Sequence, residues 1–573
     1  MARQVEKEVA KVRVDFASSL HGQESELTHY RRLPDAGMPR ETMLAYLDGL
    51  RKIGKVDWRA GKISGTVYVG EEELEEYTDL LTEVYGMFAW TNPLHPGVFP
   101  GVRKMESEIV AMTVDMFNGG DEACGVVTSG GTESISLAIK AYRDLAATER
   151  GVTNPNIVVP ISVHSAFEKA CLLFKINVRY ARVDDWTRQV DVSHVASLID
   201  SNTIMIAGSC PQFPHGIVDP ITELATLAST WGIGMHVDCC LGSFLVCNMR
   251  RAGYDFPDFD LSVPGVTSIS VDTHKYGFAP KGSSVLLYSS HRTRMYQYSL
   301  LPDWQGGVYA TANLPGSRPG ALVAATWAAL MLQGRDGYVS KTKRIVDTAR
   351  YIADGIRDID GVRLMGDPLV SVVAFTSDDF NINRLMEPLV EEKGWDLNVL
   401  QFPASMHICV TLMHTSPNVA DNFLRDLREA ATQILNDPST DLTGAAAMYG
   451  MAQSIPDRSI IGLIASTYLD LTNELPTDTP DGGDFAKDLE VVERAANVRM
   501  KAQGRPQTTP TKSKKAPAAV AAASSPEPKA KAKGKAKAGS TKAKGKGKAK
   551  AASTKAKAAA DAPSTRRTTR SRK

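Results

Sequence analysis

Short apolar runs alternate with helical stretches through the middle of this chain, and this alternation constrains the fold more than any other feature. The helical stretch after the first run places Ile135, Ala138, Ile139 and Tyr142 on one face, with a period near 3.6. Such alternation favours a mostly parallel sheet with helices on both faces and right-handed crossovers. We therefore predict an α/β fold that binds its ligand beyond the carboxyl ends of the strands. The predicted strands are residues 126–128, 157–162, 178–183, 203–208, 233–238, 267–272 and 283–288.

One apolar run leads directly into a histidine and a lysine. Residues Val271–Tyr288 read VDTHKYGFAPKGSSVLLY, so that Lys275 follows a strand and precedes a glycine-containing turn. A lysine at such a place can form a Schiff base if burial and neighbouring charges lower its pKa from the usual value of about 10.4. A surface lysine in a strand–turn–strand would look the same, so this interpretation depends on partners elsewhere in the chain.

A glycine turn follows the first predicted strand. Residues 126–134, VVTSGGTES, read as a strand, a turn with Gly130 and Gly131, and the start of a helix. Backbone N–H groups at a helix start attract phosphate, and glycines let the backbone approach it closely. The pattern is neither the Walker motif nor the dinucleotide-binding fingerprint, so by itself it indicates only an anion site.

Two more polar residues stand at strand ends. Residues 234–241, GMHVDCCL, read as a buried strand on which His236, Asp238 and Cys240 share one side. A carboxylate there needs a cation or a hydrogen-bond donor, which a protonated pyridine nitrogen or the following loop would supply. His164 follows another apolar run, where its ring can stack on a planar cofactor or serve as an ordinary structural residue.

A phosphate cradle, a stacking histidine, a buried aspartate and a Schiff-base lysine together indicate pyridoxal 5'-phosphate. The chain also resembles the sphingosine-1-phosphate lyases, in the group II decarboxylase-like branch of pyridoxal-phosphate enzymes. The resemblance extends from about residue 40 to about residue 475. The matching segments are Asn92–Gly101 (NPLHPGVFPG), Thr128–Ile135 (TSGGTESI), His164–Phe167 (HSAF), Cys210–Gly216 (CPQFPHG), His236–Phe244 (HVDCCLGSF), Val266–Ser284 (VTSISVDTHKYGFAPKGSS), Trp304–Tyr309 (WQGGVY), Gly316–Gly320 (GSRPG) and Tyr449–Gln453 (YGMAQ).

The resemblance implies a pyridoxal-phosphate-dependent transferase type I fold, with a seven-stranded, mostly parallel sheet in a large domain and a smaller C-terminal α+β domain. It also implies retro-aldol cleavage of a phosphorylated long-chain sphingoid base to a long-chain aldehyde and phosphoethanolamine. The expected catalytic residues are Lys275, Asp238 and His164. The expected cofactor-binding residues are Gly131, Thr132, His164, Asp238, His274, Lys275 and Ser317.

We expect Lys281, His95 and Tyr68 to bind the substrate phosphate. Lys281 follows from its position on the turn after Lys275, and the other two follow from the resemblance. Each also has a structural interpretation: a turn lysine in solvent, a loop histidine bonded to its own backbone, and a packed tyrosine. For the base that takes the C3 hydroxyl proton, Lys275 and a nearby tyrosine are both open.

The resemblance further implies that the loop Gly316–Arg318 reaches the cofactor phosphate from a second subunit, which would make the active unit a homodimer. One residue departs from the family pattern. The family usually has Leu-Gly-Gly-Phe after the aspartate, whereas this chain has Ser243 at the second glycine. Ser243 could narrow the space near the cofactor ring without changing the chemistry.

Two rival functions are considered. An amino-acid decarboxylase of the same superfamily would share Asp238, His164 and Lys275, but would need a group for an α-carboxylate. A polyanion- or nucleic-acid-binding protein would use the C-terminal tail, with the enzyme body secondary. Of the 66 Lys and Arg residues and 65 Asp and Glu residues, residues 501–573 hold 22 and 2, which leaves 44 and 63 for residues 1–500. The tail is therefore strongly basic and the body strongly acidic.

Composition also bears on location and domain organisation. The seven cysteines show no CxxC pair, which favours a reducing compartment and does not support zinc. We find no signal peptide or membrane-spanning run, as in the bacterial form of the resembled family, and expect a cytoplasmic protein with optional peripheral contact to an anionic membrane. The predicted parts are an N-terminal helical and extended segment (1–125), a large cofactor-binding domain (126–335), a small C-terminal domain (336–475), and a transition with a disordered, basic Lys/Ala-rich tail (476–573).

Overall fold

The computed structural model describes residues 2–22, 27–54, 56–437, 457–476 and 479–502 of the 573. Contacts divide the chain into one compact unit, Met1–Gln507, and a second, Thr508–Lys573. The second unit, the basic tail from residue 503 on and the segment Tyr449–Gln453 lie outside the described residues.

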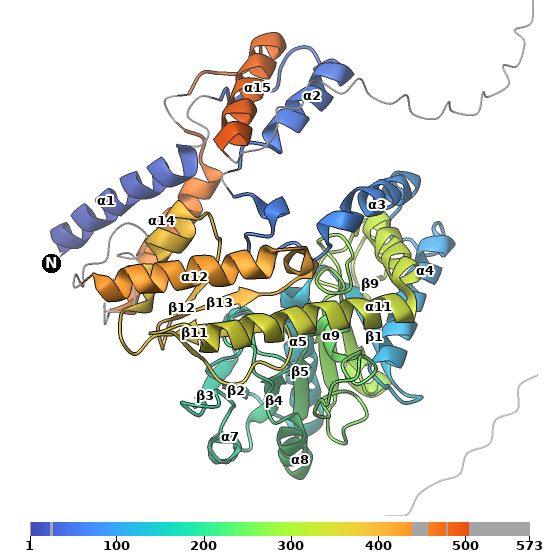
Figure 1. Ribbon diagram of the computed structural model, residues 1–573. Helices are drawn as coiled ribbons and strands as arrows, with labels where there is room; N and C mark the ends of the chain where they lie inside the picture. Colours follow the sequence, from blue (N-terminus) through green and yellow to red (C-terminus); the bar gives the residue numbers. More distant parts are fainter. Residues whose placement is uncertain (1, 23–26, 55, 438–456, 477–478, 503–573) are drawn as a thin grey trace, which may run out of the picture. The chain divides into compact units, whose positions relative to one another are not determined.

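A seven-stranded sheet forms the centre of the first unit (Figure 1). Its order is β1-β7-β6-β5-β4-β2-β3, and every neighbouring pair is parallel except the two that involve β7. The predicted mostly parallel sheet is confirmed, and each predicted strand overlaps an observed one. The strands are β1 (Cys124–Thr128), β2 (Asn156–Pro160), β3 (Asn177–Ala181), β4 (Thr203–Ser209), β5 (Gly234–Asp238), β6 (Ser268–Val271) and β7 (Ser284–Tyr288).

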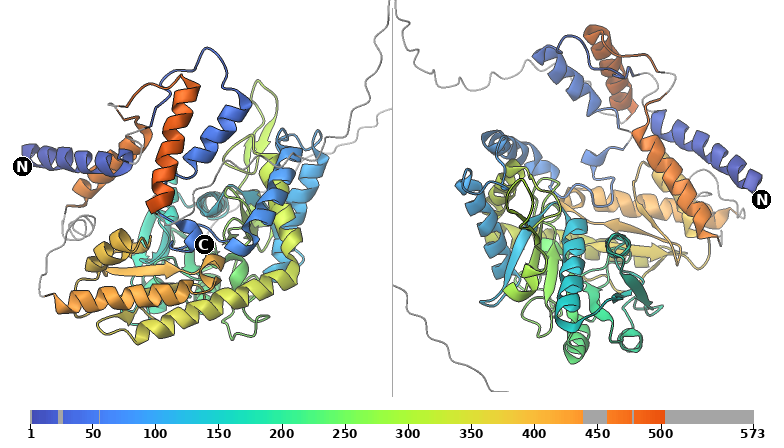
Figure 2. Two further views of the ribbon diagram at one scale, coloured as in Figure 1. Left: turned by 45° about the horizontal axis from the view of Figure 1, so that its top comes forward. Right: turned by 180° about the vertical axis from the view of Figure 1, so that it is seen from behind.

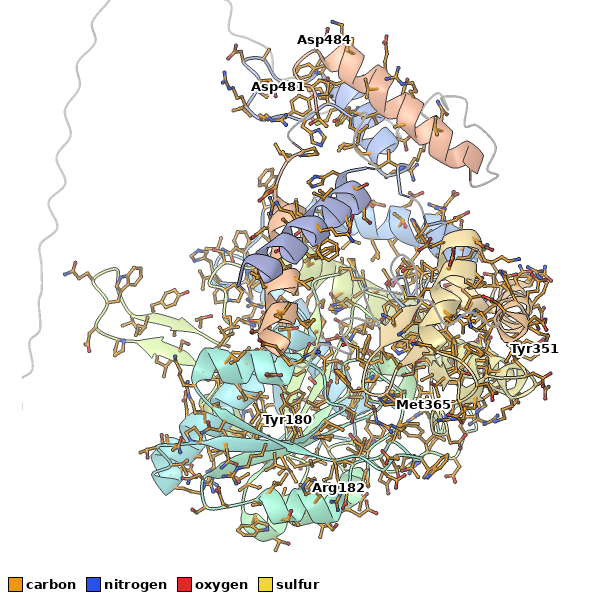
Figure 3. All side chains as sticks on the ribbon, turned by 90° about the vertical axis from the view of Figure 1, so that its left-hand side faces the viewer. Tyr180, Arg182, Tyr351, Met365, Asp481 and Asp484 are labelled. Atoms are coloured by element: carbon orange, nitrogen blue, oxygen red, sulfur yellow. The ribbon has the colours of Figure 1, made fainter. Side chains whose placement is uncertain are left out.

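Helices cover both faces of this sheet. Side chains alternate between the faces along each strand, and both faces carry apolar residues that the helices bury. Leu286 and Tyr288 of β7 pack with helices α5 (Gly131–Arg150) and α6 (Ala166–Phe174). Val285 and Leu287 belong to the core on the other face, with α4 (Pro100–Met116) and α8 (Ile221–Trp231). Strand β3 forms one edge of the sheet, which Figure 3 locates through its Tyr180.

Helix α11 (Gly320–Arg357) links the large sheet to a smaller one. Gly334 interrupts it with non-helical backbone angles, φ 55° and ψ −179°. The smaller sheet is antiparallel, with the order β10-β11-β13-β12, and α12 (Val419–Asn436) follows it. This confirms the predicted smaller α+β region. Its strands are β10 (Arg363–Leu364), β11 (Val372–Thr376), β12 (Asn398–Leu400) and β13 (Ser405–Cys409).

Helices from the two ends of the described chain pack in pairs. Helix α1 (Ala2–His21) packs with α14 (Arg458–Asn473), and α2 (Arg40–Leu50) packs with α15 (Phe485–Ala502), as the views of Figure 2 show for the second pair. Gly49 allows this close packing, since a Cβ on it would lie 2.1 Å from Val492 Cγ1. Residues far apart in sequence thus share one small apolar cluster around Leu27, Tyr46 and Val492.

The remaining elements are one helix of 15 residues and shorter connecting segments. Among the described residues, no helix combines the length and the apolar sequence that a membrane span requires. The other regular elements are α3 (Leu74–Phe88), α7 (Val192–Leu198), α9 (Ser243–Val246), α10 (His291–Met295), β8 (Ser299–Leu301) and β9 (Tyr309–Thr311), with single helical turns at Trp58–Ala60, Glu71–Glu73, Ile382–Leu385 and Leu412–Thr415 and a wider turn at Met386–Glu392.

Candidate active site

Lys275 lies in an ion pair at the carboxyl edge of the large sheet. Asp272 directly follows β6, and its Oδ2 lies 2.9 Å from Lys275 Nζ and 3.6 Å from His274 Nε2. The Asp272 side chain is only 2% exposed, whereas that of Lys275 is 23% exposed. The role of Asp272 was not predicted, although a carboxylate three residues before a lysine indicates such a pair.

The charge state of Lys275 differs from the sequence-based expectation. Burial has the largest single effect and lowers the pKa of Lys275, but interactions with Asp272, Cys240 and Tyr68 together outweigh it and raise that pKa above its ordinary value. The lowered pKa that we expected is therefore wrong for the protein as folded. The same ion pair lowers the pKa of Asp272 against the opposing effect of burial.

The start of α5 packs closely against the Lys275–Asp272 ion pair. A Cβ on Gly131 would lie 2.6 Å from Cys240 Sγ and 3.0 Å from Asp272 Oδ1, so only glycine fits without a shift. Thr132, the next residue, is exposed. Ser134 Oγ holds the helix start in place, 2.7 Å from Thr128 Oγ1 and 3.0 Å from Ser284 Oγ. The unpaired backbone N–H groups of the first turn are thus placed beside Lys275, where a phosphate would bind.

Asp238 is a buried carboxylate with one oxygen held by the protein. Its Oδ1 accepts a hydrogen bond from the Cys240 backbone N–H at 3.1 Å and a longer one from Ser270 Oγ at 3.4 Å. Oδ2 accepts none from the residues that the structure describes. This arrangement fits a protonated ring nitrogen, and with Gly131 and Lys275 it provides the groups that pyridoxal 5'-phosphate requires.

His164 stands just before α6, next to Phe213. Its Nδ1 accepts a hydrogen bond from Ala166 N at 3.1 Å, which fixes the ring, and the side chain is exposed. The Phe213 ring meets it edge-on, with 6.1 Å between centroids. The imidazole is therefore held in place by its own backbone and exposed at the carboxyl edge of the sheet.

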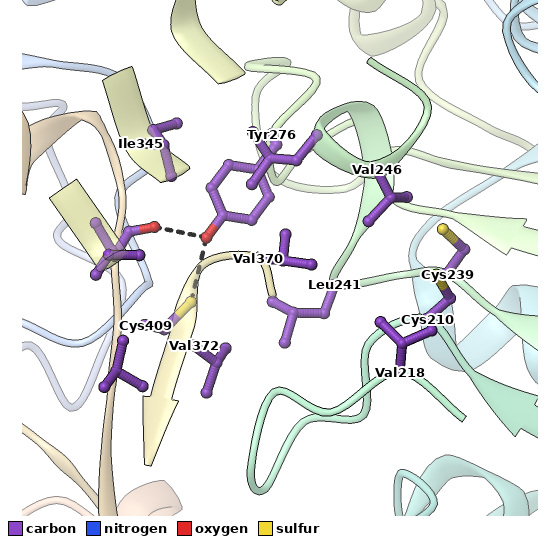
Figure 4. Close-up of a cluster of buried hydrophobic side chains, with 14 of the residues drawn as sticks. Cys210, Val218, Cys239, Leu241, Val246, Tyr276, Ile345, Val370, Val372 and Cys409 are labelled. Carbon is purple, nitrogen blue, oxygen red and sulfur yellow. Dashed lines mark hydrogen bonds between the residues drawn. The ribbon is translucent and has the colours of Figure 1, made fainter. Parts of the chain in front are cut away.

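Lys281 and Tyr68 form a second cluster next to Lys275. Lys281 Nζ lies 4.7 Å from the centre of the Tyr68 ring and 3.5 Å from the carbonyl oxygen of His274. Tyr68 packs edge-on against Tyr276, whose hydroxyl donates to Val410 O at 2.7 Å and lies 3.3 Å from Cys409 Sγ (Figure 4). Burial and the positive charge of Lys275 lower the pKa of Lys281 to about 8.

His95 and Ser317 lie together but apart from these clusters. Asn92 joins their loops: its Nδ2 donates to Ser317 Oγ at 3.1 Å, and its backbone oxygen accepts from His95 N at 3.1 Å. In the described ranges, no hydrogen bond, ion pair or ring contact connects His95 or Ser317 to Lys275 or Lys281. The His95 side chain is exposed.

Ser243 contacts the backbone that carries Asp272. Its side chain is fully buried, and its Oγ donates to the Asp272 carbonyl oxygen at 2.5 Å. Its φ of 44° lies in the left-handed region that favours glycine. Ser243 therefore anchors the ion-pair segment at the cost of backbone strain.

An amine, a buried carboxylate, an exposed imidazole and a glycine-started helix at one sheet edge are typical of a pyridoxal-phosphate-dependent enzyme. Residues 72–378 match the family model described as pyridoxal-dependent decarboxylase conserved domain. The chain is 50% identical to sphingosine-1-phosphate lyase of Drosophila melanogaster over 82% of this chain and 85% of the fly protein. It is 47% identical to sphingosine-1-phosphate lyase 1 of Mus musculus over 82% of each chain. The chain belongs to the sphingosine-1-phosphate lyase family, which confirms the resemblance stated above.

Solved structures support the same assignment. The structure of a sphingosine-1-phosphate lyase from Burkholderia pseudomallei matches with a TM-score of 0.70 and 40% identity, over 78% of this chain and 98% of that one. A glutamate decarboxylase from Lactobacillus brevis matches with a TM-score of 0.62 at 19% identity, over 74% of this chain and 99% of that one. At that identity the likeness shows a shared fold only.

Proposed function

We propose that the protein cleaves the C2–C3 bond of phosphorylated long-chain sphingoid bases, giving a long-chain aldehyde and phosphoethanolamine. The observation that carries this proposal is the pair of adjacent lysines with different surroundings. Lys275 lies against Asp272 below the start of α5, whereas Lys281 lies on the Tyr68 ring. The site thus offers one amine for the cofactor and a second cation for a substrate phosphate.

Each cofactor contact has a candidate residue in this chain. Lys275 Nζ would hold the cofactor aldehyde, and Asp238 Oδ2 would face the ring nitrogen. His164 would stack on the ring. Gly131, Thr132 and His274 would bind the phosphate. When bound, pyridoxal 5'-phosphate supplies an electron sink for the carbanion that the bond cleavage leaves.

Tyr68 and Lys281 would recognise the substrate phosphate. Burial, with a smaller contribution from Cys409, raises the pKa of Tyr68, so this hydroxyl keeps its proton at neutral pH. It is therefore suited to donate a hydrogen bond to a phosphate oxygen rather than to take the C3 hydroxyl proton. Lys281 would add the positive charge.

The test is a product assay that also decides the rival decarboxylase function. Purified protein would be incubated with a phosphorylated long-chain base and, separately, with glutamate, tyrosine and aspartate. We expect long-chain aldehyde from the first substrate and no carbon dioxide from the amino acids, and Lys275→Ala should release neither product. Carbon dioxide from an amino acid, without aldehyde from the phosphorylated base, would contradict the proposal.

We further propose that the active unit is a homodimer with shared sites. This follows from the separation of His95 and Ser317 from the Lys275 cluster within one chain, together with exposed apolar side chains near these loops, such as Trp90, which is 95% exposed, and Val308, which is 82% exposed. In a dimer, these loops would complete the partner's site.

Mixing two inactive variants tests the shared site. Equal amounts of Lys275→Ala and His95→Ala protein, unfolded and refolded together, should recover about a quarter of wild-type activity, because half of the dimers contain one intact site out of two. Each variant refolded alone serves as the control. If the mixture is no more active than the two variants separately, the sites are not shared.

The basic tail supports a second, independent activity, which we propose to be binding of nucleic acid or another polyanion. Residues 501–573 carry 22 Lys and Arg against 2 Asp and Glu, and such a segment gains affinity by releasing counterions. Truncation after Gln507, beyond the end of α15, should abolish retention on a heparin column without lowering aldehyde release. Retention that persists would place the polyanion site elsewhere.

We propose a cytoplasmic location with peripheral contact to membranes. All seven cysteines are free thiols, which suits a reducing compartment. The tail would provide the contact with anionic lipid. The truncated protein should therefore also lose binding to vesicles that contain phosphatidylserine, and undiminished binding would contradict this role.

A further inference from the structure

A series of buried polar groups lies behind Asp238, between β5, β6 and α5. Strands β5 and β6 pair His236 with Ser268 and Asp238 with Ser270. Ser268 Oγ lies 2.7 Å from His236 Nδ1, and Ser270 Oγ lies 3.2 Å from His236 Nε2. Ser270 Oγ donates to Asp238 Oδ1 at 3.4 Å. At the far end, the hydroxyl of Tyr142 in α5 donates to Ser268 Oγ at 2.7 Å.

These hydrogen bonds can all point toward the carboxylate. Burial lowers the pKa of His236 to about 4, so the ring is neutral at neutral pH and has one acceptor and one donor nitrogen. Because Ser268 accepts from Tyr142, its own proton can go to His236 Nδ1. The His236 Nε2–H then donates to Ser270, which leaves the Ser270 proton for Asp238.

The polar residues of β6 are fully buried, and their presence there requires a physical explanation. Ser268 and Ser270 are 0% exposed and alternate with Ile269 and Val271, which are equally buried. A buried hydroxyl costs free energy unless it is hydrogen-bonded, and an apolar pair would avoid that cost. The hydroxyls are therefore better explained by what they do for Asp238 than by packing.

We propose that Ser268, His236 and Ser270 are positioning residues that act in relay to hold the Asp238 carboxylate opposite the cofactor ring nitrogen. The inference rests on the proposed function, since it takes Asp238 as the partner of that nitrogen. A hydrogen bond donated to a carboxylate favours its charged form. The relay delivers such a donor from the side of Asp238 that the cofactor does not occupy.

Other titratable groups around Asp238 do not replace this relay. Asp219, His236, Cys239 and Cys240 interact electrostatically with it. Burial raises the pKa of Asp219 to about 7, so this carboxyl carries a partial negative charge near neutral pH that repels Asp238 and does not stabilise its carboxylate. Burial raises the pKa of both thiols, which stay neutral. Apart from Ser270, the donor to Oδ1 is the Cys240 backbone N–H.

The experiment removes two hydroxyls of the relay one at a time in the full-length protein. Ser270→Ala removes the donor to Asp238, and Ser268→Ala removes a group that touches neither Asp238 nor the cofactor. Thr113→Val is the matched control, since Thr113 in α4 is equally buried and donates to Ile109 O at 2.7 Å. The measurements are the Kd for pyridoxal 5'-phosphate, the pH titration of visible absorbance after reconstitution, and the melting temperature.

We expect Ser270→Ala to weaken cofactor binding about tenfold, the effect of one lost hydrogen bond to a charged group, and Ser268→Ala to weaken it by a smaller factor. Both should move the pH midpoint of the absorbance, whereas Thr113→Val should change only the melting temperature. If Ser270→Ala does not fold, Ser268→Ala alone decides the question.

Two outcomes would overturn the inference. Wild-type Kd and pH midpoint in both serine variants, with only a lower melting temperature, would make the serines purely structural. An effect of Ser270→Ala without any effect of Ser268→Ala would reduce the relay to one local contact. A wild-type protein that does not bind the cofactor would instead contradict the proposed function.

Discussion

Lys281 is the residue whose charge should set the alkaline limit of substrate binding. Its pKa is lowered to about 8, so the ammonium is charged below that pH and neutral above it. A neutral amine cannot pair with a phosphate. We expect kcat/KM for a phosphorylated long-chain base to fall as the pH rises through about 8, measured as aldehyde release across the pH range.

Lys281→Arg is the control for this profile, because a guanidinium stays charged. The alkaline fall should move upward by about one pH unit or more in that variant. An unphosphorylated long-chain base should show no such dependence on residue 281. An unchanged profile in Lys281→Arg would assign the fall to another group.

Ser243 allows strain and hydrogen bonding to be separated at a single residue. Ser243→Ala loses the bond to the Asp272 carbonyl oxygen but keeps the left-handed φ, and should destabilise the fold by about 1 kcal/mol. Ser243→Gly loses the same bond but relieves strain of ~1–2 kcal/mol, so it should stay close to wild type in urea unfolding. Equal losses in both variants would show that strain contributes nothing.

Site residues that stand at the ends of strands could be predicted from the sequence. Lys275 and Asp238 stand where apolar runs stop, and the structure places both at the sheet edge. The sequence did not reveal the effect of Asp272, because a pKa depends on distance and burial in the folded chain. Nor did it indicate that Ser243 would donate to a carbonyl oxygen 29 residues away.

At the scale of elements, the start of α5 should be the most sensitive to added volume. Gly131→Ala would bring a methyl group within 2.6 Å of Cys240 Sγ and 3.0 Å of Asp272 Oδ1. The helix start would have to shift beside Lys275. We expect cofactor affinity to fall roughly tenfold to a hundredfold, measured as Kd for pyridoxal 5'-phosphate.

The neighbouring Gly130→Ala is the matched control. Its backbone is extended, with φ 161°, and the added methyl would meet only His274 Cε1 at 3.4 Å, an ordinary contact. This variant should bind the cofactor nearly as wild type does. Equal losses in the two variants would mean that backbone freedom, and not the space at Gly131, controls the site.

Helix α11 offers a second pair of glycines with opposite expected effects. Gly334 has φ 55° and ψ −179°, a conformation that is strained for any other residue, so Gly334→Ala should destabilise the protein by ~1–3 kcal/mol. Gly337 has ordinary helical geometry and only a flexible Gln333 side chain nearby, so Gly337→Ala should stabilise it by about 0.5–1 kcal/mol. Chemical denaturation measures both. A stabilising Gly334→Ala would contradict the observed kink.

Strands with a clear pattern of apolar residues were predicted well. Elements with a weak pattern, or with contacts to distant parts of the sequence, were not. The strands of the large sheet could be predicted because apolar side chains fill both of its faces. Strand β10, with two residues, is too short to give any pattern. The hairpin of β8 and β9 was also missed, since exposed side chains such as Leu300 give no alternation of burial.

At the scale of the whole molecule, local patterns do not show which ends of the chain meet. The packing of α2 (Arg40–Leu50) against α15 depends on contacts across more than four hundred residues, such as Gly49 with Val492. The four predicted parts of the chain stay a prediction. The kink at Gly334 lies one residue before the predicted end of the large domain at residue 335.

The central claim is that the Lys275 amine carries pyridoxal 5'-phosphate, and chemical trapping tests it most directly. The reconstituted full-length protein would be treated with borohydride and digested, and the modified peptide identified by mass spectrometry, with Lys281→Ala as the control for the neighbouring amine. We predict loss of the visible absorbance on reduction and one pyridoxyl group, on Lys275, in both proteins. A protein that gains no visible absorbance with the cofactor, or whose reduced adduct lies on another lysine, would contradict the account.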